Sequence, residues 1–202
     1  MLTAVVEEAP AKGERTRRAV LDAAVAQFAA VGRRGTSVSS IARQVGLTPG
    51  AVYVYFPSKQ ALFEAAVDAD AAGLIADALP EILAGGFDGD FGRVFARLLA
   101  CLPTHPLARR VLAGEEGTGA ERLVKLPSEL RLHEGLTTAL RNGQQVGTIR
   151  GDIDPELFAI GLESIVVALL IAILQTGGDS DPKSSEGVLA VLEAAIRPIL
   201  SS

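Results

Sequence analysis

Tryptophan is absent from the 202 residues, cysteine and methionine occur once each, and histidine occurs twice. A single cysteine, Cys101, cannot form an intramolecular disulfide, and two histidines leave little material for a zinc site. The longest uninterrupted apolar run, Ile165–Leu174, has ten residues, against the roughly 20 of a membrane-spanning helix, so no span is expected. The first residues carry two glutamates where a secretory signal carries basic residues. We therefore expect a cytoplasmic protein without metal or cofactor.

Charge is distributed unevenly along the chain, whose formal net charge is −5. Residues 11–60 hold eight basic and two acidic side chains, whereas residues 61–202 hold eleven basic and twenty acidic ones. This asymmetry is typical of a basic binding segment joined to an acidic body, and it predicts that the N-terminal quarter alone contacts a polyanion. An arbitrary distribution of surface charge is the alternative.

The spacing of apolar residues is helical throughout, and no segment alternates apolar and polar residues over the length of a strand, which predicts an all-α fold. We expect a flexible tail over residues 1–13, a helix-turn-helix head over 14–57, and a helical ligand-binding and dimerisation domain over 58–202. The expected helices cover residues 14–31, 38–45, 47–56, 59–79 with Ser58 as its cap, 91–102, 107–112, 128–146, 155–175 and 186–200. The long fourth helix would join the head to the rest of the chain.

Residues 36–62 contain two short helices joined at Gly46-Leu47-Thr48, the proportions of a helix-turn-helix. Glycine in the turn accepts a positive φ without steric cost, which lets the second helix cross the first at a steep angle. The apolar positions expected to form a small core are Ile41, Ala42, Val45, Leu47, Val52 and Phe56. The positions left facing outward are Thr48, Pro49, Gly50, Ala51, Tyr53, Val54 and Tyr55. Their donors suit phosphate oxygens, and Ala51 and Val54 suit thymine methyl groups.

The stretch from Arg18 to Leu62 resembles the DNA-binding domain of the tetracycline-repressor (TetR) family of bacterial transcription regulators. The positions at the family's spacing are Leu21-Asp22-Ala23-Ala24, Phe28, Gly32, Thr36, Ile41-Ala42, Val45-Gly46-Leu47-Thr48, Gly50, Val52-Tyr53, Phe56, Lys59 and Leu62. Two positions depart from the family: Tyr55 replaces the usual histidine, and Ser40 replaces the usual acidic residue. The second change removes a capping-box partner of Ser37, the expected N-cap of the helix at 38–45.

The resemblance implies a homodimeric repressor that binds a palindromic DNA operator, catalyses no reaction, and is released by a small, mostly apolar effector. The residues expected to contact DNA are Arg18, Ser37, Thr48, Pro49, Gly50, Ala51, Tyr53, Val54, Tyr55 and Lys59. Two alternatives stay open: a helical enzyme or small-molecule-binding protein with a vestigial head, and a constitutive DNA binder without an effector. The alternative to DNA contact for Tyr53 and Tyr55 is that they are half-buried aromatic residues whose hydroxyl groups are exposed to solvent.

Residues 63–202 carry no motif, so candidates there rest on chemistry and position. The candidates for a ligand pocket are Cys101, His105, His133, Phe158, Leu162 and Glu163, because such sites are mostly apolar with a few polar anchors. Cys101 and His105 are four residues apart, but Pro103 and Pro106 interrupt the helix that a thiol–imidazole pair would need.

The run Ile165–Leu174 presents apolar atoms on every side of its helix, so one side can pack on its own domain and the opposite side needs a further packing partner. The final helix could supply part of that cover and a second subunit the rest; a monomer whose own helices enclose the run is the alternative. The residues expected at the subunit contact are Ile165, Leu169, Ile173, Val188, Leu192 and Ile196.

Overall fold

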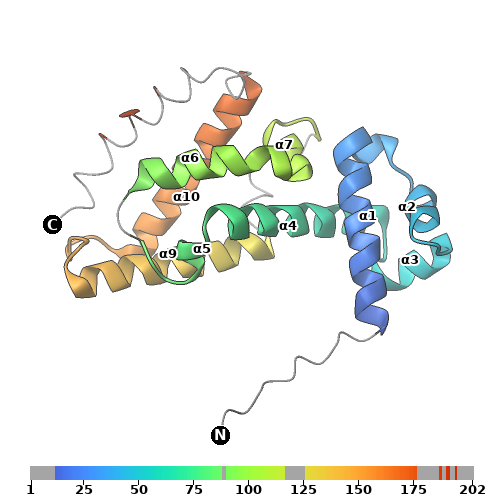
Figure 1. The fold of residues 1–202 in the computed structure, drawn as a ribbon, viewed down its shortest axis with the longest axis horizontal. Helices are drawn as coiled ribbons and strands as arrows, with labels where there is room; N and C mark the ends of the chain where they lie inside the picture. Colours follow the sequence, from blue (N-terminus) through green and yellow to red (C-terminus); the bar gives the residue numbers. More distant parts are fainter. Residues whose placement is uncertain are drawn as a thin grey trace, which may run out of the picture. The chain divides into compact units, whose positions relative to one another are not determined.

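The computed structural model describes residues 12–87, 90–116 and 126–176, together with Gly187, Ala190, Val191 and Ala194. These residues form helices and turns, and no strand occurs among them, so the all-α prediction is confirmed for the described chain (Figure 1). The helices are α1 (Lys12–Gly35), α2 (Val38–Gln44), α3 (Pro49–Tyr55), α4 (Lys59–Ala78), α5 (Pro80–Leu83), α6 (Phe91–Cys101), α7 (Pro106–Leu112), α9 (Pro127–Val146) and α10 (Pro155–Gln175), with a 3-10 turn, η1, at Leu102–Thr104.

The chain divides into two compact units, Met1–Ala66 and Val67–Ser202. The division falls inside α4, nine residues after the boundary expected at residue 57. The physical reason is that Leu62, Phe63 and Ala66, in the first part of α4, are buried and belong to the core of the N-terminal unit. Lys12 and Gly13, expected in the tail, already lie in α1, and residues 1–11 are outside the described part.

In the N-terminal unit, α2 packs against both α1 and α3 (Figure 1). Its fully or almost fully buried side chains are Val20, Ala24, Phe28, Ile41, Ala42, Val52, Phe56, Leu62, Phe63 and Ala66. The rings of Phe28 and Phe63 meet edge to face, with centroids 5.1 Å apart, an arrangement that aromatic pairs favour. This core holds α3 by its inner side and leaves its outer side exposed.

In the C-terminal unit, α9 packs against α5 and α10, and α10 packs against α7. Asp154 caps α10 by accepting hydrogen bonds from the amides of Glu156 and Leu157, as the Asp-Pro pair predicts. The expected helix at 186–200, with Val188, Leu192 and Ile196, lies outside the described residues apart from isolated positions. Two short elements, α5 and η1, were not expected from the sequence.

α10 is long and apolar enough to cross a membrane by length and composition alone, although its longest uninterrupted apolar run has only ten residues. Glu163 and Ser164 precede the uninterrupted apolar run without making the helix as a whole polar. One side of α10 is buried, including Ala159, Leu162, Leu170, Ile173 and Leu174. The core helix of a soluble protein passes the same test of length and composition, so the test alone does not place α10 in a membrane.

Candidate DNA-binding surface and ligand cavity

The turn between α2 and α3 has a closed hydrogen-bond pattern. At the end of α2, Gly46 adopts a φ of 71°, the Leu47 amide donates to the Ala42 carbonyl at 2.8 Å, and the Gly46 amide donates to the Arg43 carbonyl at 3.2 Å. These two bonds form a Schellman motif, which needs a left-handed residue where glycine stands. The helix-turn-helix predicted from the position of Gly46 is therefore present in the structure.

Side-chain caps begin both helices of this motif. Ser37 Oγ accepts a hydrogen bond from the Ser40 amide at 3.0 Å, and Thr48 Oγ1 accepts one from the Ala51 amide at 3.3 Å. The cap expected at Ser37 is confirmed. Each hydroxyl accepts one bond in its cap, and its proton is free to point elsewhere because a hydroxyl both donates and accepts.

α2 is fixed to α1 by a short polar network. Gln27 of α1 accepts a hydrogen bond from Ser40 Oγ at 2.6 Å and donates one to Gln44 Oε1 at 2.7 Å. Ser40 thus has a role that an acidic side chain in a capping box would not perform. Arg17 also lies over the ring of Phe56, at 5.1 Å from its centroid, so α1 contacts the segment that ends α3.

The predicted DNA-contacting residues fall into two groups by exposure. Tyr53 is 46% exposed and Val54 is 81% exposed on α3. Thr48, Pro49 and Gly50 are also exposed. Ala51, Tyr55 and Lys59 are half-buried, so they present only part of their surface. The outward side of α3 is therefore continuous and carries no formal charge.

Ser37 and Arg18 stand apart from α3. Ser37 is exposed at the start of α2, and Arg18 is exposed on α1, where its Nε lies 3.4 Å from Asp22 Oδ1. A solvent-exposed ion pair of this kind contributes little to stability. The guanidinium of Arg18 can exchange Asp22 for a phosphate at small cost.

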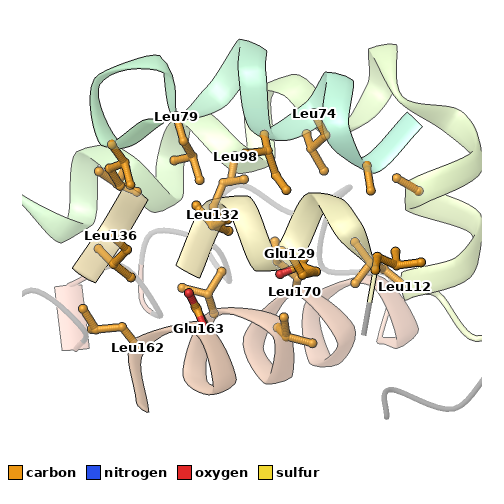
Figure 2. A pocket seen from close by; sticks show the side chains of 18 of the residues that line it. Leu74, Leu79, Leu98, Leu112, Glu129, Leu132, Leu136, Leu162, Glu163 and Leu170 are labelled. Atoms are coloured by element: carbon orange, nitrogen blue, oxygen red, sulfur yellow. The ribbon is translucent and has the colours of Figure 1, made fainter. Parts of the chain in front are cut away.

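A cavity of about 90 Å³ lies within the C-terminal unit, between α4, α5, α6, α7, α9 and α10. One buried water needs about 10–15 Å³ on this measure, so the cavity has room for a small organic molecule. Its walls are leucine, valine, isoleucine, alanine and phenylalanine side chains, with two exceptions, Glu129 and Glu163. Figure 2 shows these two carboxyl groups among labelled side chains that are otherwise all leucines.

Two of the six residues predicted for a pocket, Leu162 and Glu163, line this cavity. The other four are not among its described lining residues. Cys101 is half-buried at the last position of α6, and Phe158 is half-buried one turn before Leu162 on α10. His133 contacts the lining residue Glu163, with its Nδ1 3.2 Å from Glu163 Oε2.

His105 has a structural role that excludes it from the cavity. Its Nδ1 lies 3.4 Å from Asp70 Oδ1 and its Nε2 lies 3.1 Å from Asp77 Oδ2, so two carboxylates of α4 hold the ring. Gly73 makes the approach possible, because a Cβ at that position would lie 2.8 Å from the imidazole. The sequence analysis proposed His105 for a ligand pocket, and its polar partners on α4 were not anticipated.

Two aspartates of α4 also cap neighbouring helices. Asp70 Oδ2 accepts hydrogen bonds from the amides of Leu107 and Ala108 at the start of α7, each at 2.8 Å. Asp68 Oδ1 accepts one from the Ser128 amide at the start of α9, at 2.9 Å. A carboxylate at a helix N-terminus satisfies amides that have no partner in the helix. The second half of α4 is thereby fixed to two helices that line the cavity.

The two glutamates of the cavity are perturbed by their surroundings. Burial among apolar side chains, with the nearby charges of Glu163 and Asp68, raises the pKa of Glu129 to about 7. Burial also raises the pKa of Glu163, and the hydrogen bond with His133 partly offsets this. Glu163 Oε1 is fully buried and has no hydrogen-bond partner among the described residues. Leaving such an oxygen unpaired costs about 1–3 kcal/mol.

Glu129→Gln is expected to change how stability depends on pH. Because the pKa of Glu129 is about 7 in the folded chain and its ordinary value is 4.5, the folded state binds more protons between these values. The free energy of unfolding of the unmodified protein should therefore fall as pH rises from 4.5 to 7, and glutamine removes this loss. Relative to the unmodified protein, the variant should gain up to about 3 kcal/mol by about pH 8.

Urea unfolding from about pH 5 to about pH 8 measures the difference between the two pH profiles. Glu134→Gln is the matched control, since Glu134 is exposed on the same helix and does not line the cavity. A Glu129→Gln profile that runs parallel to that of the unmodified protein would show that the folded chain does not hold this proton.

The predicted subunit-contact residues lie on different sides of α10. Ile165 is 43% exposed, and Leu157 and Ile160 are exposed by 69% and 49%. Leu169 is half-buried. Ile173, in contrast, is only 5% exposed because it faces the interior of its own unit. The exposed apolar side of α10 therefore runs from Leu157 to Ile165 and does not include Ile173.

Comparison with known proteins adds sequence evidence for the N-terminal unit. Residues 20–66 match the family described as bacterial regulatory proteins, tetR family. The HTH-type transcriptional repressor SCO4008 of Streptomyces coelicolor is 28% identical to this chain over 198 residues, which cover 93% of this chain and 96% of the relative.

Solved structures share the fold over nearly the whole chain. A TetR-family transcriptional regulator from Pectobacterium atrosepticum is 21% identical, with a TM-score of 0.70, and the match covers 96% of this chain and 99% of that one. A TetR-family regulator from Cytophaga hutchinsonii is 20% identical, with a TM-score of 0.66 and coverage of 96% and 98%. At these identities, the likeness concerns the fold.

Proposed function

We propose that this chain, a transcription regulator of the tetR family, represses transcription in the cytoplasm by binding a two-fold symmetric DNA operator as a homodimer. The family match over residues 20–66 and the repressor similar along almost its whole length support the regulatory role. We further propose that a small, mostly apolar effector enters the cavity of the C-terminal unit and lowers the affinity for the operator. In this scheme, the chain binds and releases DNA and catalyses no reaction.

The observation that carries the proposal is the exposed outer side of α3. An uncharged helix surface with Val54 and Tyr53 exposed can enter the major groove, where apolar atoms contact thymine methyl groups. Gly50 also favours close approach: a Cβ there would meet no atom of the chain closer than 4.0 Å. The chain itself thus does not require glycine at this position, whereas a DNA backbone lying against the start of α3 would.

Phosphate contacts would come from the hydroxyl and amino groups around this surface. Thr48 and Ser37 use an oxygen lone pair in their caps and keep a proton to donate. Tyr53, Tyr55 and Lys59 supply further donors. Contacts of this kind set the register of a protein on the duplex and carry no sequence information, so they complement the base contacts of Ala51 and Val54.

Dimerisation is supported by the exposed apolar side of α10. Two heads on a symmetric operator must stand about 34–36 Å apart, one helical turn of DNA, to occupy adjacent major grooves. A second copy covering Leu157, Ile160 and Ile165 would remove these side chains from water. It would also fix the spacing of the two α3 helices.

Effector release is supported by the construction of α4. Its first part places Leu62, Phe63 and Ala66 in the core of the N-terminal unit, and its second part lines the cavity and caps α7 and α9. A ligand that favours a different position of the cavity helices would act on α4 directly. By linkage, the ligand would lower the affinity of the protein for the operator, and the operator would lower the affinity of the protein for the ligand by the same factor.

Selection of bound sites from a random DNA pool tests the proposal. We expect an inverted repeat to be enriched, with half-site centres about 10 base pairs apart or a multiple of that distance, bound by two copies of the chain. Sedimentation of the complex gives the number of copies. A pool without any enriched sequence would overturn the operator-binding function and favour a helical small-molecule-binding protein with a vestigial head.

A further inference from the structure

The cavity of the C-terminal unit combines two features that rarely occur together. Its walls are apolar, yet two carboxyl groups from different helices, Glu129 of α9 and Glu163 of α10, line it (Figure 2). A folded chain loses solvation when it buries a carboxylate, and an apolar residue of similar size would avoid that loss. The presence of both carboxyl groups therefore indicates a bound molecule that compensates their lost solvation.

Glu163 is the more informative of the two. Its side chain is only 14% exposed, and its Oε2 lies 3.2 Å from His133 Nδ1. Its other oxygen, Oε1, is fully buried without a hydrogen-bond partner among the described residues. One oxygen is thus satisfied by the chain, and the other has no donor among the described residues although Glu163 lines the cavity. A purely apolar ligand would fill the cavity and leave this oxygen unpaired.

The charged groups around the cavity determine which sign of charge the ligand can carry. Glu129 precedes His133 by one turn of α9, and Asp68 of α4 lies near enough to act on Glu129 electrostatically. Among the described residues, the titratable groups that line this cavity or contact its two glutamates are three carboxyl groups, of Glu129, Glu163 and Asp68, and the imidazole of His133. An anionic ligand would be repelled, and a cation would reduce the repulsion between Glu129 and Glu163.

We propose that the cavity binds an organic monocation with an apolar body, whose ammonium group donates to Glu163 Oε1 and is held between Glu163 and Glu129. The cavity of about 90 Å³ has room for about six to nine water-sized groups, the size of a medium-chain alkylamine. Leu132, Leu136 and Leu170 contact the apolar body. The inference of a cation site rests on the proposed function in one respect, that the bound cation is the effector.

Binding of three eight-carbon probes to the full chain tests the proposal: octylamine, octanol and octanoate, measured by calorimetry at about pH 8. The probes share their alkyl chain and differ in the charge of the head group. Octylamine should bind at least about tenfold more tightly than octanol, and octanoate most weakly. Octanol or octanoate binding as tightly as octylamine would overturn the cation site.

Variants locate the charge that is responsible. Glu163→Gln should weaken octylamine binding at least about tenfold and change octanol binding little, whereas Glu134→Gln, exposed on α9 and outside the lining, should alter neither. Circular dichroism verifies that each variant is folded. A folded Glu163→Gln protein that still prefers octylamine to octanol by the original factor would overturn the assignment.

The pH dependence of octylamine binding keeps the proposal testable if Glu163→Gln does not fold. Octylamine stays charged from about pH 6 to about pH 8, while Glu129, which faces Glu163 and Asp68, loses its proton over this range. His133, whose Nδ1 lies 3.2 Å from Glu163 Oε2, is the other titratable side chain in contact with this site. Affinity should therefore increase with pH by up to about tenfold, and an affinity that is constant or decreases would contradict the proposal.

The operator assay separates this site from the proposed function. Charge-selective binding of octylamine with no change in operator affinity over a full titration would overturn effector release and leave the cation site in place. Equal binding of octanol would overturn the cation site whatever happens at the operator.

Discussion

Val54→Asp is expected to abolish sequence-specific DNA binding while leaving the protein folded and dimeric. Val54 is 81% exposed on α3, so its replacement removes almost no contact within the chain. In a major groove, the new carboxylate would lose its water and face the phosphate field, with no cation to pair with it. Specific sites are bound about 10³–10⁷ times more tightly than other DNA, and we expect at least about a 1,000-fold loss.

Val31→Asp provides the matched control for this experiment. Val31 is also an exposed valine of the N-terminal unit, at 57%, but it lies on α1 and not on α3. The Val31→Asp variant introduces the same charge as Val54→Asp and should reduce the affinity for the operator far less. Operator titrations by fluorescence anisotropy at fixed salt compare the two variants, and sedimentation verifies that both remain dimeric. If Val54→Asp retains the operator affinity of the control, α3 does not read DNA through this side chain.

The helix boundaries could be predicted from the sequence where a capping residue stands beside a proline or glycine. Asp154-Pro155 begins α10, Thr48-Pro49 begins α3, and Gly46 ends α2 with its Schellman motif. These signals are local, because each involves backbone groups within about one turn. The elements that were missed, α5 and η1, are four and three residues long. Such short elements contain too few residues to show helical periodicity.

The candidate sites were predictable to different degrees for the same reason. The outer side of α3 follows from which side of a short helix must face the core, and Val52 and Phe56 determine that side. Glu129 was missed because an acidic residue in the first turn of a helix is usually a solvated group that favours the macrodipole. Its spacing from Leu132 and Leu136 places it on the apolar side of α9, and this was the available signal.

The polar contacts of α4 could not be predicted. Asp70 is 37 residues from Leu107, and Asp68 is 60 residues from Ser128, so nothing in the local sequence indicates that they meet. Helical periodicity shows which side of α4 a residue occupies but not which helix lies opposite. These caps matter for function because they connect cavity helices to the one helix that also contributes to the core of the N-terminal unit. The route proposed for effector release therefore depends on residues that only the structure revealed.

Ile165→Asp is expected to dissociate the dimer and, with it, most operator binding. Ile165 is 43% exposed in the single chain, so an aspartate there is solvated in the monomer, and the subunit should still fold. In a dimer formed through the exposed side of α10, each subunit would bury an unpaired carboxylate at a cost of several kcal/mol. Losing the second head removes its avidity, typically a factor of about 10²–10⁴.

Sedimentation equilibrium at micromolar concentration measures this dissociation, and Leu83→Asp is the control. Leu83 is 40% exposed on α5 of the same unit, so it offers a similarly exposed apolar side chain away from α10. The unmodified protein and the control should be dimers, and Ile165→Asp should be a folded monomer that binds half-sites weakly. If the unmodified protein is a monomer, the proposed dimer is contradicted. The proposal that two subunits bind a symmetric operator is then contradicted as well. A dimeric Ile165→Asp variant would instead show that the subunits meet through another surface, since burying two unpaired carboxylates in this contact would cost several kcal/mol each.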